Sequence, residues 1–361
     1  MMKFLLAILL ILHGLIHLMG FAKAFHYGKI TQIKDEISKP IGILWLLDSV
    51  LFILSAVLLL LKNDFWILLS VIALIISQIL IFKTWKYAKF GALINIFLLI
   101  IVILSYGSIR FENDFKNDTK KSITISNSKK TEILTQNDIK HLPLVVQNYL
   151  KYAGAINKPK VKNMRVVFEG EMRENGKRYF PFTSEQYNFF EEPSRLFFMK
   201  GKMFGLTVPG YHKYQDGKAA MNIKLFGIFP IIRHSGAVMD KTETVTLFND
   251  MCLLAPATLI DKRIQWQFID DKTVKATFTN KESRISARLY FNEKGHLVNF
   301  ISDDRTAMAD GKQYPFSTPV SDYKSVNGIK LMSYGEAVWY YPDGKFTYGK
   351  FHLKEIQYNC K

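Results

Sequence analysis

Four long apolar stretches constrain this chain more than any other feature of its sequence. Each holds 18 to 21 residues, and Asp48 is the one formally charged residue among them. At a rise of about 1.5 Å per residue, helices of that length cross a hydrocarbon core of about 30 Å. Helices at the surface of a soluble core need a polar face, which these stretches lack. The sequence therefore predicts four transmembrane helices, over residues 4–22, 41–61, 65–82 and 90–107.

Charge separates these stretches from the rest of the chain. Residues 1–107 contain nine Lys, no Arg and four acidic residues, which gives a net charge of +5. The remainder holds 39 basic and 27 acidic residues, which gives a net charge of +12. This division excludes a fully soluble protein, a disulfide-stapled miniprotein and a disordered chain.

Lysines in the short loops predict the orientation. Four Lys lie in 23–40 and three in 83–89, against Lys3 and Lys62 on the other side. Because short Lys-rich loops stay in the cytoplasm, we expect a multi-pass protein of the cytoplasmic (inner) membrane with an extracytoplasmic C-terminal domain. Basic residues between 110 and 121 favour the opposite orientation. We expect the first stretch to be retained, since no small-residue cleavage site directly follows it.

Five polar residues in the apolar stretches form a predicted intramembrane polar layer. His17, Asp48, Gln78 and Asn95 each lie four to seven residues from an end of their stretch. This places all four roughly 6 to 11 Å below the same lysine-rich face. His13 precedes His17 by one helical turn, so both imidazoles lie on one side of the helix. Ionisable groups inside a bilayer face the bundle interior or water, and they are candidates for function.

Two interpretations of the polar layer remain open. Two imidazoles and a carboxylate suit a transition metal or a proton relay, so His13, His17 and Asp48 are candidate metal ligands of a membrane-embedded metal or redox protein. Alternatively, the layer supplies hydrogen bonds between helices, worth about 0.6 to 2 kcal/mol per contact. No third His, Cys or Glu lies in the four stretches to complete a tetrahedral site, which favours the second interpretation.

The composition after residue 107 predicts a polar linker followed by a β-rich domain. Residues 108–135 are rich in Lys, Asn, Ser, Thr and Asp, which is typical of a tether. A helix is predicted from Pro143 to Gly154, because proline favours a helix start and glycine a helix end. From Lys160 onward, apolar residues alternate with polar ones between turn dipeptides. This pattern predicts antiparallel hairpins with about nine to eleven strands.

One segment departs from the alternation. Residues 241–260 carry apolar side chains at three- and four-residue steps, with Pro256 as a late stop, and are predicted to form an amphipathic helix. We therefore predict a four-span α-helical membrane domain over 1–107 and an α+β domain over 136–361. The second domain is expected to be a long curved antiparallel sheet of the open-barrel type with one or two packed helices. Whether such a sheet encloses a cavity or a filled core stays open.

No motif identifies a chemical activity. The chain lacks the nucleophile elbow, the HExxH motif, the P-loop, the dinucleotide-binding glycines and the CxxC motif, so catalytic and ligand-binding residues remain unknown. A binding or structural role is favoured over an enzyme, and a metal ion is the one cofactor considered. Cys252 and Cys360 can form a disulfide outside the cytoplasm, but we expect two free thiols.

The charged residues of the C-terminal domain suggest surface roles. Glu169 and Glu171 share a strand face that we expect to be exposed. Asp303, Asp304 and Arg305 are expected to form an ion pair at a strand end. The net positive charge favours anionic lipid headgroups over nucleic acid as partners, at about 1 kcal/mol per basic residue near the membrane surface.

Short motifs along most of the chain carry a resemblance to known proteins. In the apolar part these are His13-Gly14-Leu15-Ile16-His17, Gly20-Phe21, Ser77-Gln78 and the segment from Trp85 through Ala88-Lys89-Phe90-Gly91 to Asn95. In the C-terminal part they are Ala255-Pro256-Ala257-Thr258-Leu259-Ile260, Asp304-Arg305, Ser317-Thr318-Pro319-Val320, Asn327-Gly328 and Gly335-Glu336-Ala337-Val338-Trp339. The chain resembles an uncharacterised family of bacterial membrane proteins with four N-terminal transmembrane helices and a C-terminal domain of unknown function. The resemblance implies no activity, because none is assigned to that family.

Fold analogy alone suggests a function for the β-rich domain. A curved sheet with a central helix is similar to the open barrels of lipoprotein carriers, which shelter acyl chains. The leading hypothesis is therefore that the exported domain binds a lipid or lipophilic ligand in cell-envelope maintenance. A structural or interaction module, whose transmembrane helices associate with one another, is the remaining alternative. The sequence does not predict the oligomeric state.

Overall fold

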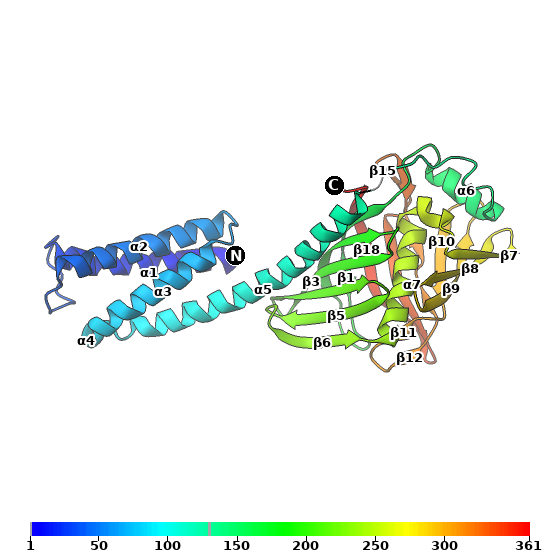
Figure 1. The fold of residues 1–361 in the computed structure, drawn as a ribbon. Coiled ribbons are helices and arrows are strands. Elements are labelled where there is room, and N and C mark those ends of the chain that lie inside the picture. The colour runs from blue at the N-terminus through cyan, green and yellow to red at the C-terminus, as the bar shows by residue number, and fades with distance from the viewer. Residues whose placement is uncertain (1, 129–130) are drawn as a thin grey trace. The chain divides into compact units, whose positions relative to one another are not determined.

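The chain forms two compact units, Met1–Arg110 and Phe111–Lys361. A computed structural model describes residues 2–128 and 131–361. Figure 1 shows helices in the first unit and a large curved sheet in the second. The four apolar N-terminal helices and the open-barrel sheet with a packed helix confirm the predicted fold class.

The first unit is helical. Its elements are α1 (Met2–Ala24), α2 (Lys39–Leu60), α3 (Trp66–Lys83), the short α4 (Trp85–Ala88) and the first part of α5 (Gly91–Ser126). Within the described residues, α1, α2, α3 and α5 are each long and apolar enough to cross a membrane. The close approach of α1 to α2 depends on Gly20, because a Cβ there would fall 2.2 Å from the Trp45 ring. Small residues at such contacts are typical of helix pairs in membranes.

The structure corrects the predicted linker. Residues 108–126 were expected in a polar linker over 108–135, but they continue α5 as part of one 36-residue helix. Phe111 and Phe115 lie one turn apart, and buried Thr119, Ser122 and Ser126 follow on the same face. One face of this extension is therefore buried although its composition is polar, and it packs on the sheet of the second unit. Residues 129 and 130 of the predicted linker lie outside the described residues.

The second unit is built on one 14-stranded antiparallel sheet. The strand order is β6-β5-β4-β3-β2-β1-β18-β17-β13-β10-β9-β8-β7, with β14 paired to β17, and β6 and β7 form the two edges. Two small sheets pair β11 with β12 and β15 with β16. The strands are β1 (Asn163–Met172), β2 (Phe180–Phe189), β3 (Ser194–Met203), β4 (Leu206–Gln215), β5 (Lys218–Leu225), β6 (Phe229–Ser235), β7 (Ile264–Asp270), β8 (Thr273–Asn280), β9 (Ser283–Phe291), β10 (Leu297–Ser302), β11 (Thr306–Ala307), β12 (Lys312–Gln313), β13 (Phe316–Ser317), β14 (Val320–Ser321), β15 (Lys324–Val326), β16 (Ile329–Leu331), β17 (Tyr334–Tyr341) and β18 (Gly344–Tyr358).

The predicted turn dipeptides lie where successive strands connect. They are Asn175-Gly176, Asp216-Gly217, Asn280-Lys281, Lys294-Gly295, Asn327-Gly328 and Asp343-Gly344. The sheet has more strands than expected, partly because β13 and β14 are only two residues long. Two further connections, at Phe204-Gly205 and Phe226-Gly227, have a phenylalanine where a turn usually has Asn or Asp.

Helices cover the inner side of the sheet. They are α6 (Leu144–Ala153), α7 (Ala237–Leu254) and the 3-10 helix η1 (Pro256–Ile260). The helix predicted over 241–260 begins at Ala237 and ends at Leu254, because Pro256 cannot continue the α-helical hydrogen-bond pattern. In Figure 1, α7 lies on the concave side of the curved sheet.

A filled apolar core lies between α7 and the strands from β7 to β10. The Phe248 ring of α7 stacks on the Phe278 ring of β8, with 5.2 Å between centroids. The Tyr149 hydroxyl of α6 donates to the carbonyl oxygen of Cys252 at 2.9 Å. Cys252 is buried and Cys360 is half-buried, and both are free thiols, as expected.

Candidate functional sites

The predicted intramembrane polar layer is brought together in the first unit. His13 and His17 come from α1, Asp48 from α2, Gln78 from α3 and Asn95 from α5. His13 Nε2 lies 2.9 Å from Asn95 Oδ1, and Asn95 Nδ2 donates to Gln78 Oε1 at 3.1 Å. His17 Nε2 lies 2.9 Å from Asp48 Oδ2. Contacts between helices therefore join the five residues in two sets, one of His13, Asn95 and Gln78 and the other of His17 and Asp48.

Ser77 of α3 is a sixth member of the layer. Its hydroxyl lies 2.9 Å from His17 Nε2 and 3.1 Å from Asn95 Oδ1. It therefore bridges the two halves of the layer. Sequence reasoning did not select it, because a serine in a membrane helix commonly bonds only to its own backbone.

The hydrogen bonds of His17 locate a proton in the layer. His17 Nδ1 lies 2.9 Å from the carbonyl oxygen of His13, which can only accept, so Nδ1 carries a hydrogen. His17 Nε2 lies 2.9 Å from both the Ser77 hydroxyl and Asp48 Oδ2, so it faces polar groups of two neighbouring helices.

A metal ion has no preformed ligand set in the described part of the chain. No group of three or more His, Cys, Asp or Glu side chains is arranged there to hold one. His13 and His17 are close, with ring centroids 4.9 Å apart, but His13 Nε2 contacts Asn95 rather than facing Asp48. Metal binding by His13, His17 and Asp48 stays a prediction.

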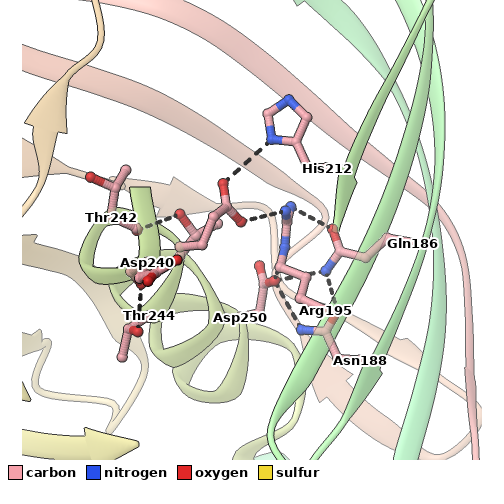
Figure 2. A network of polar contacts seen from close by, with 10 residues as sticks. Gln186, Asn188, Arg195, His212, Asp240, Thr242, Thr244 and Asp250 are labelled. Atoms are coloured by element: carbon pink, nitrogen blue, oxygen red, sulfur yellow. Dashed lines mark hydrogen bonds and ion pairs between the residues drawn. The ribbon is translucent and has the colours of Figure 1, made fainter. Parts of the chain in front are cut away.

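A buried network of charges lies on the concave face of the sheet, between α7 and strands β2 to β4 (Figure 2). Its centre is Arg195 of β3, whose guanidinium is buried. Arg195 Nε donates to Asp250 Oδ2 at 2.9 Å, and Nη1 donates to Glu243 Oε2 at 3.2 Å. Arg195 Nη2 donates to Gln186 Oε1 at 3.0 Å. One arginine thus contacts two buried carboxylates of α7.

Neighbouring polar groups complete the network. Gln186 Nε2 and Asn188 Nδ2 donate to Asp250 Oδ2 at 2.7 and 2.9 Å. His212 Nδ1 of β4 lies 3.4 Å from Glu243 Oε1. Burial alone would raise the pKa of Glu243, but the Arg195 guanidinium and His212 outweigh it and lower that pKa to about 2. Burial raises the pKa of Asp250, and Arg195 offsets only part of this effect.

The remainder of the concave face is apolar and only partly covered. On β3, the α7 contact lies at Arg195, but the strand continues for eight more residues to Met203. Strand registers place a set of half-buried apolar side chains on the same face as Arg195 in this continuation. We call this set the apolar cradle, and its members are Met172, Phe180, Met203, Leu206, Met221, Ile223 and Ile232.

Other charged residues singled out in the sequence form surface contacts. Glu169 pairs with Lys354 and Glu171 with Lys350 on the exposed side of the sheet. The acidic residues after β10 do not pair with Arg305 as expected. Asp303 pairs with Arg288 and Asp304 with Lys241, whereas the Arg305 guanidinium stacks on the Phe316 ring at 3.9 Å.

Comparisons with known proteins identify a family but no activity. The family model described as "Family of unknown function (DUF6544)" matches residues 132–351. No curated protein matches the chain. A LolA superfamily protein from Nitrosomonas europaea has 7% sequence identity and a TM-score of 0.35, and the match covers 60% of this chain and 94% of that one. A β-barrel-like protein of unknown function (DUF1849) from Brucella abortus has 10% identity and a TM-score of 0.18, with 55% and 98% covered.

Proposed function

This chain belongs to DUF6544, a family of unknown function, and we propose its function from the geometry of the structure because the family has no assigned activity. We propose that it is a multi-pass membrane protein whose β domain lies outside the cytoplasm. There the domain would bind a lipid or another lipophilic ligand and serve cell-envelope maintenance. The membrane assignment is supported by four apolar helices, and the orientation by the lysine-rich loops.

The apolar cradle is the observation that carries this proposal. Its side chains are only partly buried on the inside of a curved sheet, where a core would normally cover them. Three of the seven are methionines, which adapt to irregular apolar ligands because the side chain is unbranched and flexible. Each buried CH₂ of an acyl chain contributes about 0.8 kcal/mol, so a few contacts suffice for binding.

The charged network sets one limit of the ligand site. Arg195 lies beyond the cradle toward α7, and His212, with a partly exposed side chain, lies beside the cradle residue Met221. An acyl chain would therefore lie along the cradle and end at these polar groups, which can bond to a headgroup oxygen. This arrangement suits an amphiphile better than a fully apolar molecule.

Photo-crosslinking in the full chain tests the proposal. A photoreactive amino acid replaces Met221, which faces the cradle, or the adjacent Ala220, which faces the opposite side of β5. In bilayer nanodiscs we expect lipid adducts at position 221 in clear excess over position 220. Equal labelling at both positions, together with a protein that is free of lipid by native mass spectrometry, would contradict lipid binding by the cradle.

The polar layer supports a second candidate function. Asp48 is 0% exposed, and its Oδ1 has no hydrogen-bond partner among the described residues. We propose that this oxygen can accept a metal ion or a proton, with His17 as the neighbouring group. Metal analysis and optical spectra of the detergent-purified protein, compared with His17→Ala, test the metal alternative. The absence of metal or chromophore in both proteins would remove it.

A further inference from the structure

Two hairpin tips of the β domain expose large apolar side chains. Phe204, in the turn between β3 and β4, is 99% exposed. At the start of β6, directly after its connection from β5, Phe229 is 55% exposed and Ile231 is 57% exposed. Because β3 to β6 are neighbouring antiparallel strands, alternate turns share an end of the sheet, and both tips lie at the same end.

Turn stability does not account for Phe204. Phe204 and Gly205 have φ of 50° and 77°, as the first and second residues of a two-residue hairpin turn. Such turns favour Asn-Gly or Asp-Gly, because few other residues tolerate a positive φ. The next hairpin follows this rule, with Asp216 and Gly217 at φ of 53° and 74°. At position 204 the chain has a phenylalanine in a strained backbone conformation, and its side chain is almost fully exposed rather than packed against the described residues.

The two tips lie close to residues that directly follow the predicted transmembrane stretch in the chain. Phe111 follows the last predicted transmembrane residue, at position 107, by four residues of one continuous helix, a rise of about 6 Å. Lys224, at the end of β5, lies over the Phe111 ring with its Nζ 4.6 Å from the centroid. Lys200 of β3 pairs with the adjacent Glu112 at 2.6 Å. The tips therefore lie at the end of the sheet where the second unit begins, four residues of chain after the predicted span.

Lysines lie beside the apolar tips. Lys202 and Lys224 flank them, as does Lys200, which pairs with Glu112. At the opposite end, where α5 finishes near β1, the charges are mixed, with Glu191, Glu192 and Asp216 beside Lys218 and Lys281. Lysines around exposed aromatic residues complement an anionic lipid surface.

We propose that the two tips, centred on Phe204 and Phe229, insert into the headgroup region of the same membrane that α5 crosses. Phe204 and Phe229 enter the boundary between headgroups and acyl chains, and Lys202 and Lys224 contact anionic headgroups. The proposal does not depend on ligand binding in the cradle. If lipid binding by the cradle and insertion of the tips are both correct, the membrane contact keeps the open end of the cradle next to the bilayer from which the cradle would take its lipid.

Spin-label accessibility in the full chain tests the insertion. In a Cys360→Ser background that retains buried Cys252, a nitroxide is attached at Phe204→Cys or, as the matched control, at Asp216→Cys. Both positions have φ near 50° in two-residue turns, but they lie at opposite ends of the sheet. In nanodiscs of phosphatidylglycerol and phosphatidylethanolamine, we expect the oxygen-to-nickel-chelate accessibility ratio to be higher at 204. Equal ratios at the two positions would overturn the proposal.

A second variant separates membrane contact from folding. Phe204→Asp introduces a residue that this turn type favours, so we expect the thermal unfolding midpoint to stay equal or rise. A nitroxide at Phe229→Cys in this variant should lose accessibility to oxygen and gain accessibility to the nickel chelate. An unchanged ratio at 229 would show that the tips do not form one membrane contact, which also overturns the proposal. Lipid crosslinking at Met221 reports separately on the cradle.

Discussion

Arg195 faces the carboxylates of Glu243 and Asp250 in a buried part of the β domain. Bringing three charged groups out of water is costly, and apolar residues of similar volume commonly stabilise such a site equally well. We therefore expect the network to add little net stability over an apolar alternative. Removing one member would nevertheless destabilise the fold strongly, because each buried charge is compensated by the charges and hydrogen bonds of the other members.

Arg195→Ala should lower the free energy of unfolding by about 3 to 5 kcal/mol, because it leaves Glu243 and Asp250 buried without their cation. Denaturant unfolding of the purified protein measures this. The matched control is Arg288→Ala, which removes an exposed pair with Asp303 and should cost at most about 1 kcal/mol. Similar losses in both variants would contradict the role assigned to Arg195.

Acid should weaken the fold through Glu243. Its pKa falls from 4.5 to about 2 on folding, so its stabilisation is present above pH 4.5 and is lost as the pH falls toward 2. The raised pKa of Asp250 acts in the opposite sense. Glu243→Gln should therefore flatten the decline in unfolding free energy over this range, whereas Glu282→Gln, at an exposed site, should leave it unchanged. Identical pH profiles for both variants would refute this assignment.

The residues of the two candidate sites differ in how far sequence predicts them. The polar layer could be predicted, because membrane helices have a fixed rise and their polar residues can be compared by depth. The charged network could not, because Arg195 and Glu243 are 48 positions apart and meet only through the packing of α7 on the sheet. The spacing of apolar residues in α7 predicts a helix, but it does not predict that Glu243 and Asp250 of this helix are buried against the sheet.

The same contrast holds for the secondary structure elements. Turns with glycine after Asn or Asp were predicted, because that pair favours the left-handed conformation of a hairpin turn. The Phe204-Gly205 turn has the same backbone but not the same sequence signal. The extension of α5 was missed because its polar composition outweighed the helical spacing of Phe111 and Phe115.

The α5 extension should contribute measurably to the stability of the β domain. Phe115 is 2% exposed and stacks on Phe198, with 5.4 Å between centroids. Phe115→Ala should lower the free energy of unfolding by about 3 to 5 kcal/mol, through lost burial and an unfilled cavity. Ile125→Ala, on the exposed side of the same helix, is the control and should cost about 0.5 kcal/mol or less. Thermal unfolding of both variants measures the difference.

At the scale of the whole molecule, the boundary between the two units lies inside α5. A polar linker would have allowed the β domain to be released by a cut anywhere between 108 and 135. Instead, the segment from Phe111 to Ser126 belongs to the packed surface of that domain, where it covers Phe189, Leu196 and Tyr211.

Two truncated chains test this boundary. A chain of residues 109–361 keeps the α5 extension, and we expect it to be monodisperse and to unfold cooperatively. A chain of residues 127–361 exposes the apolar surface that α5 covers, so it should unfold at a lower temperature and aggregate. Size-exclusion chromatography and thermal unfolding compare the two. Equal behaviour would mean that the extension is dispensable for the β domain.

The sheet ends at β6 and β7 without closing into a barrel, so the outer sides of these strands lack a neighbouring strand in the sheet. Free strand edges can recruit another chain and start polymerisation. Pro230 and Arg233 make β6 a poor template, because proline lacks an N–H and the arginine adds charge. On β7, Phe268 and Ile269 are exposed, so this strand is the more vulnerable of the two to intermolecular pairing.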